Sequence, residues 1–256
     1  MKYQNLVTGI AIAFFGLTSP LLAFDPKTAQ QLLETKNCPN CDLTEVNLYE
    51  ANLQESILNN AVLIKAILTR ANLYKANLMT ANLSNANLQG AQLYQANFTN
   101  ANLTEADLSN ANMIESNLSG ANLTSANLYK ASLGKVNFKG VKLINANLQE
   151  VNLYKADLSN TDLSNAILQD VNLNIANLSG ANLSGANLKK AHLTGTNLVG
   201  VNLINADLTD AILDNTNLSK ANLSGANLSN VNLSTAILCE TTMPDGSFSQ
   251  KGCPSN

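Results

Sequence analysis

The sequence predicts one domain built from a repeated unit, on two observations. The first is a large apolar residue at every fifth position from Leu43 to Leu238, which is Leu throughout except at Phe98, Met113 and Phe138. A period of five matches neither the α-helix, at 3.6, nor the β-strand, at 2, so it indicates a repeat architecture. The second is composition: only 13% of residues are charged while 45% are hydrophobic, which argues against a disordered chain.

Each large residue follows a small one by two positions, with Asn or Asp between them in most repeats, as in Ala121-Asn122-Leu123. Alternating layers of large and small side chains can fill a narrow interior without voids. Asn and Asp suit corners, because their side chains bond to nearby turn backbone. The repeated unit therefore supplies both a core and a turn.

This A-(N/D)-L-x-x pattern resembles the pentapeptide-repeat family over residues 38 to about 248. The resemblance implies a right-handed, four-sided β-helix with one pentapeptide per side, so that residues 38–238 would form about ten coils. At strand spacing these coils would make a rod roughly 48 Å long. The segments Cys38 to Leu43 and Thr242 to Gly246 resemble the entry and exit of exported cyanobacterial members.

If one turn takes 20 residues, as the resemblance implies, outward charges 20 apart should lie on adjacent coils. Opposite charges do fall at this spacing, and such pairs favour one register. The pairs are Glu45 with Lys65, Glu50 with Arg70, Glu55 with Lys75, Glu115 with Lys135, Lys130 with Glu150, and Lys190 with Asp170 and Asp210.

The first 23 residues have the pattern of a secretory signal peptide: Lys2, an apolar stretch from Leu6 to Leu17, and a small residue at Ala23. An uncleaved anchor is the alternative, but the apolar stretch is shorter than the roughly 20 residues that span a bilayer. We therefore expect cleavage after Ala23, no stable membrane insertion afterwards, and a periplasmic or thylakoid-lumenal protein.

A solenoid needs covered ends. Residues 24–37 should form a cap helix, since Asp25-Pro26 has the pattern of an N-cap and first helical position, with Ala29, Leu32 and Leu33 on one apolar face. Residues 239–256 should form a C-terminal cap or tail, because Met243 to Gly246 contains a turn signal.

The four cysteines lie at these two ends. An even count in an exported protein favours disulfides, and we expect Cys38–Cys41 and Cys239–Cys253. Cys38-Pro39-Asn40-Cys41 could instead be a redox-active C-x-x-C motif, although the βαβ setting of thioredoxin-like proteins is missing. A four-cysteine zinc site would require the two pairs to meet, although the repeats separate them.

No catalytic constellation emerges. His192 is the single histidine and takes an outward position usually held by Asn; Asp157 and Asp162 fit turn positions better than an acid–base pair. No phosphate-binding, dinucleotide or calcium motif is present, so the sequence predicts no enzyme, cofactor or metal. A formal net charge of −3 offers no basic footprint for nucleic acid.

Outward apolar residues near the start suggest an interaction patch. Several replace the usual Asn within one early turn, and two tyrosines and an isoleucine follow one another at intervals of 20. Stacked apolar side chains also stabilise a β face by themselves, and that alternative stays open. The residues of this candidate patch are Ile57, Val62, Ile64, Ile67, Tyr74, Tyr94 and Ile114.

The sequence thus favours a non-enzymatic structural or protein-interaction scaffold with an unknown protein partner, either monomeric or a weak dimer. Two alternatives remain. One is a DNA mimic that binds a topoisomerase, as in family members that shield DNA gyrase, although the charges here alternate in sign instead of accumulating. The other is a thiol–disulfide redox protein that uses Cys38 and Cys41.

Overall fold

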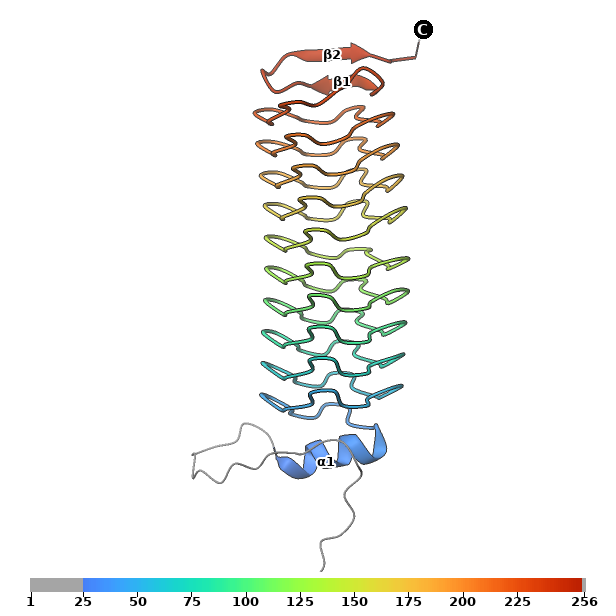
Figure 1. The fold of residues 1–256 in the computed structure, drawn as a ribbon, viewed down its shortest axis with the longest axis vertical. Helices are drawn as coiled ribbons and strands as arrows, with labels where there is room; N and C mark the ends of the chain where they lie inside the picture. Colours follow the sequence, from blue (N-terminus) through green and yellow to red (C-terminus); the bar gives the residue numbers. More distant parts are fainter. Residues whose placement is uncertain (1–24, 255–256) are drawn as a thin grey trace, which may run out of the picture.

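The computed structural model describes residues 25–254. The signal-peptide prediction for residues 1–23 lies outside this range. The chain forms a straight rod of stacked coils, with helix α1 (Pro26–Thr35) at one end and a two-stranded antiparallel sheet, β1 (Leu238–Thr242) with β2 (Phe248–Lys251), at the other (Figure 1). It is the β solenoid that the family resemblance implied.

One coil takes 20 residues. Parallel bridges join residues 20 apart along the rod, as between Asn52 and Asn72, and a turn falls in every five-residue segment. Each coil therefore contains four segments of five residues, which we call sides. We number the sides by their first members: side one begins with 41–45, side two with 46–50, side three with 51–55 and side four with 56–60.

Each corner is built by the repeated unit. The Asn side chain accepts a hydrogen bond from the backbone N–H two residues later, as between Asn72 Oδ1 and Tyr74 N at 3.1 Å. The fifth residue then adopts a left-handed conformation, with φ of 54° at Lys75. Asn side chains also bond from coil to coil, as between Asn102 Nδ2 and Asn82 Oδ1 at 3.0 Å. The polar residue of each repeat therefore supports both the turn and the stack.

The interior is a continuous column of the predicted Leu and Ala residues, which are almost completely buried along the rod. Phe98, Met113 and Phe138 occupy Leu positions and are equally buried. Burying this much apolar surface is the main favourable contribution to folding.

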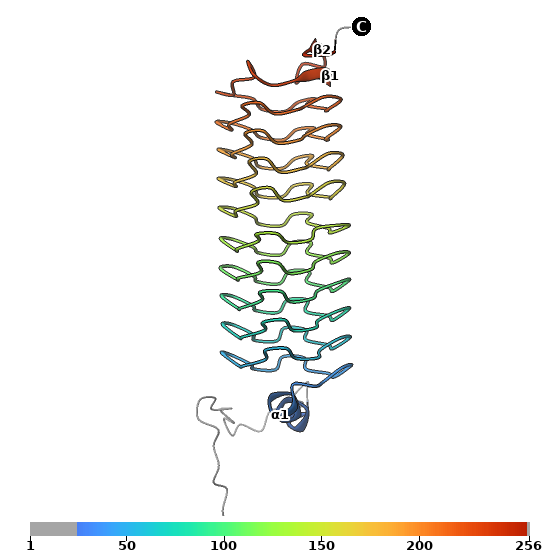
Figure 2. The same cartoon turned by 90° about the vertical axis from the view of Figure 1, so that its right-hand side faces the viewer.

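Helix α1 closes the first coil. Asp25 caps it by accepting from Lys27 N at 3.0 Å, and Lys36 ends it in the left-handed conformation. Ala29 and Leu32 are buried and belong to the same apolar core as the coils. Figure 2, in which the helix is seen nearly end-on, shows it lying across the end of the rod.

The other end is closed only in part. A disulfide joins Cys239 in β1 to Cys253 just after β2. Lys251 Nζ donates to Leu233 O at 2.5 Å, which ties β2 to the last coil. Even so, Leu228 and Leu233 of that coil are only partly buried, unlike the Leu residues of the preceding coils.

Most of the predicted charge columns form ion pairs. The N···O distances are 3.5 Å for Lys65–Glu45, 3.4 Å for Arg70–Glu50, 3.2 Å for Lys130–Glu150 and 3.0 Å for Lys135–Glu115. Two expected columns do not pair within residues 25–254. Lys75 lies over the ring of Tyr74 instead of reaching Glu55, and Lys190 pairs with neither Asp170 nor Asp210.

Candidate interaction surface

The early apolar residues of the candidate patch do not share one surface. Ile57 pairs with Asn37 and Asn77, Val62 with Asp42 and Asn82, and Ile67 with Asn47 and Asn87. Because each side holds only five residues, these three side chains lie on successive sides of the rod and point in different directions. Ile64 shares side one with Val62. The expectation of one early cluster is therefore wrong.

Tyr74, Tyr94 and Ile114 do lie in one column, on side three. The rings of Tyr74 and Tyr94 stack with centroids 5.8 Å apart and an interplanar angle of 2°. Lys75 Nζ lies 5.1 Å from the centroid of the Tyr74 ring. All three residues of the column are half-buried, so they present an apolar surface held rigidly by the coils beneath.

A charged network adjoins this aromatic column. Glu115 accepts hydrogen bonds from Gln95 Nε2 at 2.8 Å, Tyr94 Oη at 2.9 Å and Lys135 Nζ at 3.0 Å. These bonds, above all the one from Gln95, lower the pKa of Glu115 from 4.5 to about 2. The bond to Glu115 also raises the pKa of Tyr94. Only the Glu115–Lys135 contact was predicted from the spacing of 20.

The surface presents a fixed aromatic pair, and tyrosines are enriched where proteins bind other proteins, whereas Glu and Lys belong more often to the polar rim of such interfaces. His192 is exposed, and parallel bridges pair it with Asn172 and Ile212 on the two adjacent coils. Across residues 25–254 no group of three His, Cys, Asp or Glu side chains could hold a metal ion. Within the same residues, no helix is both long and apolar enough to cross a membrane.

Both cysteine pairs are disulfide-bonded, with Cα atoms 5.5 Å apart for Cys38–Cys41 and 4.7 Å apart for Cys239–Cys253. Cys38 is completely buried, with its Sγ 3.9 Å from Thr28 O. It follows the C-terminal end of α1 closely, where the helix dipole disfavours a thiolate. Reactive C-x-x-C motifs instead lie at helix N-termini.

The family model for pentapeptide repeats matches the chain in eight copies that together cover residues 41–170 and 176–238. The chain belongs to the pentapeptide repeat family. Its structure is similar to that of HetL, a pentapeptide repeat protein involved in heterocyst differentiation regulation from the cyanobacterium Nostoc sp. strain PCC 7120. The two are 32% identical, with a TM-score of 0.63, covering 86% of this chain and 97% of HetL.

Other pentapeptide repeat structures are more distant. Rfr23 from the cyanobacterium Cyanothece 51142 is 26% identical, with a TM-score of 0.36, covering 62% of this chain and 96% of Rfr23. Full-length QnrB1, a plasmid-mediated fluoroquinolone resistance protein, is 20% identical, with a TM-score of 0.46, covering 76% of this chain and 94% of QnrB1. No curated protein matches the chain.

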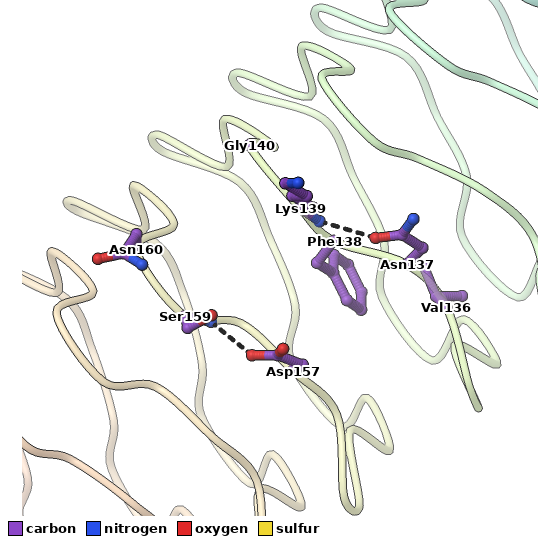
Figure 3. A pocket seen from close by; sticks show the side chains of 8 residues that line it. All are labelled: Val136, Asn137, Phe138, Lys139, Gly140, Asp157, Ser159 and Asn160. Atoms are coloured by element: carbon purple, nitrogen blue, oxygen red, sulfur yellow. Dashed lines mark hydrogen bonds between the residues drawn. The ribbon is translucent and has the colours of Figure 1, made fainter.

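The pentapeptide repeat stack is interrupted midway along the rod, on side four. A crevice of about 550 Å³ lies between two successive coils there. Figure 3 shows its two walls facing one another, with residues 136–140 on one and residues 157–160 on the other. None of the residues of the candidate patch lines this crevice. Its lining residues are Val136, Asn137, Phe138, Lys139, Gly140, Asp157, Ser159 and Asn160.

Proposed function

We propose that this pentapeptide repeat protein is an exported, non-enzymatic scaffold that binds a protein partner through the aromatic column of side three. The rod would be the right-handed, four-sided β-helix that the family resemblance implies. The stacked pair Tyr74–Tyr94 carries the proposal. Its rings lie on a rigid face beside the Glu115 network. The two tyrosine side chains would therefore lose little conformational freedom when a partner binds.

The two disulfides support export. Such bonds persist in oxidising compartments and are rare in the cytosol. Each one lies at an end of the rod, beside α1 or between β1 and the end of β2, where a solenoid most needs closure. The proposed compartment is the periplasm or the thylakoid lumen.

Two other functions fit the structure less well. A redox role for Cys38 and Cys41 conflicts with the burial of Cys38 and with its place after the C-terminal end of α1. A DNA mimic would present accumulated negative charge. Here several exposed acids, such as Glu50 and Glu150, are matched by a cation one coil away.

The test begins with cell fractionation and crosslinking of the tagged full-length protein, followed by mass spectrometry of its neighbours. A processed, exported form with one dominant neighbour is expected. Recovery in the cytoplasm with residues 1–23 intact would refute export and would favour the topoisomerase-binding alternative.

Variants then locate the surface. Tyr74→Ser with Tyr94→Ser should abolish the dominant crosslink, because both rings of the stacked pair are lost. Tyr154→Ser is the matched control, since Tyr154 lies on the same side and is exposed but belongs to no stacked pair among the described residues. An unchanged neighbour together with a lowered melting temperature would show that the tyrosines only stabilise the rod.

A further inference from the structure

The crevice on side four coincides with a break in the backbone ladder. The backbone hydrogen bonds that join one coil to the next, here called rungs, are present on the coils before and after it. Leu118 N donates to Asn137 O at 3.1 Å, and Leu158 N donates to Asn177 O at 2.7 Å. Between the two coils that line the crevice, the bridge expected from Asn137 to Asp157 is absent. Within residues 25–254, every other bridge of this register from Asn37 to Asp207 is formed.

Because these rungs are missing, polar backbone groups on both walls lack their partners in the ladder. Phe138 N and Gly140 N make no backbone hydrogen bond to Asp157 O and Ser159 O, their partners in this register. The same is true on adjoining side three, where Leu133 N and Lys135 N lack their backbone bonds. On side three, however, the Ser132–Asn152 bridge is formed, so the ladder is broken on side four alone, where residues 136–140 face residues 156–160.

Side-chain volume explains the opening. Phe138 fills a Leu position and is flanked at the small-residue positions by Val136 and Val141, all three being buried. A single large residue does not open the stack: Phe98 is flanked by Ala96 and Ala101, and its N–H donates to Asn117 O at 2.7 Å.

A single valine is tolerated as well. Val201 takes the small-residue position of its repeat, and its carbonyl accepts from Asn222 N at 3.0 Å. The combination of Val136, Phe138 and Val141 in consecutive repeats is therefore what overfills the layer, since close-packed interiors accommodate extra methylenes only by backbone shifts. The crevice is a consequence of these residues and not of the fold in general.

Its properties suit a peptide. The volume of about 550 Å³ falls within the roughly 300–1,000 Å³ range of ligand sites. Both walls are β backbone with unpaired donors and acceptors, and leaving such groups without partners is costly. Val136 and Phe138 make the lining partly apolar. An extended chain can satisfy backbone groups on both walls at once, as strands do when they are added to a sheet.

We propose that this crevice binds an extended peptide segment, which enters as an additional strand between the two coils. Its main chain would accept from Phe138 N and Gly140 N and donate to Asp157 O and Ser159 O. The one opened side corresponds to a segment of about five residues. Its side chains would alternate as in the repeat, with small and large apolar residues inward and polar residues outward. This site is separate from the aromatic column.

The probe is a fluorescein-labelled pentapeptide, Ala-Asn-Leu-Ser-Gly, which has the sequence of residues 176–180. Fluorescence anisotropy with the full-length, disulfide-intact protein should show saturable binding. The same peptide N-methylated at alternate residues should bind at least about tenfold more weakly, because it loses main-chain hydrogen bonds.

Two protein variants locate the binding. Val136→Ala with Phe138→Leu restores the common repeat, so the rungs should form and the peptide should bind at least about tenfold more weakly. Phe98→Leu makes a comparable core change where the ladder is intact, and it should leave peptide binding unchanged. Equal binding to the closed variant would place the peptide elsewhere and overturn the proposal.

Hydrogen exchange of the free protein tests the crevice itself. The amides of Phe138 and Gly140 should exchange much faster than that of Phe98, and the bound peptide should slow them. Slow exchange without peptide would show that the rungs are formed and no crevice exists. Fast exchange without peptide binding would show a crevice filled by water alone. Either result overturns the proposal.

Discussion

Two serines at small-residue positions should weaken the rod, and replacing them should strengthen it. Ser56 and Ser116 are 0% and 1% exposed, and neither hydroxyl has a hydrogen-bond partner. A buried hydroxyl without a partner costs about 1–3 kcal/mol. Alanine, the common residue at these positions, removes the hydroxyl and leaves only a minor void. We expect Ser116→Ala to raise the free energy of unfolding by about 1–3 kcal/mol.

Thr216→Ala is the matched control. Thr216 lies at a small-residue position on the same side four and is equally buried, but its Oγ1 donates to Leu213 O at 2.8 Å. Losing that hydrogen bond and a methyl group should lower the free energy of unfolding by about 1–2 kcal/mol.

The assay is thermal unfolding of the disulfide-intact protein, in which 1 kcal/mol corresponds to roughly 2–4 °C for a chain of this size. Ser116→Ala and Thr216→Ala should shift the melting temperature in opposite directions. A fall of similar size in both variants would refute the reasoning, because it would mean that the Ser116 hydroxyl is hydrogen-bonded as Thr216 is.

Three further outcomes follow from the structure. Replacing Cys239 and Cys253 with serine opens a loop whose ends are 14 residues apart and should cost roughly 3 kcal/mol, measured by denaturant titration; no change would show that the bond does not constrain the unfolded chain. Glu115 has a pKa lowered to about 2, so its stabilising contribution is complete above about pH 4.5 and is lost as the pH falls toward 2. Glu115→Gln should flatten this part of the acid-unfolding curve, and an unaltered curve would contradict the assignment. Gly200→Ala should cost about 1–2 kcal/mol in thermal melts through backbone strain alone, since φ is 65° and no atom lies within 4 Å of an added Cβ; Gly200→Asn should cost less, because Asn tolerates this conformation better.

The repeat made most of the rod predictable. Leu43 and its successors determine the core because one residue type recurs at one spacing, and no competing pattern fits a period of five. The N-terminal helix had an equally local signal, because Asp25-Pro26 both caps and starts it.

The functional surfaces were harder to predict because they depend on the direction in which each side chain points and on the summed volume of neighbouring core side chains. Ile57, Val62 and Ile67 are close in sequence, yet each corner turns the next side chain away from the last. The crevice depends on the summed volume of Val136, Phe138 and Val141, although each of these types is accommodated elsewhere in the rod. The sequence signal that could have predicted the crevice is the occurrence of these three enlarged core residues close together.

The 20-residue register also bears on how fast this protein folds. Nearly all pairing between coils joins residues 20 apart in the 230 residues from 25 to 254, a relative contact order of no more than about 0.09. That value lies in the range of helical bundles, which fold within microseconds to milliseconds, and below that of most β proteins. Each coil can form as soon as the preceding one offers its edge. Lengthening the rod by whole coils should therefore barely change the time needed to add each one.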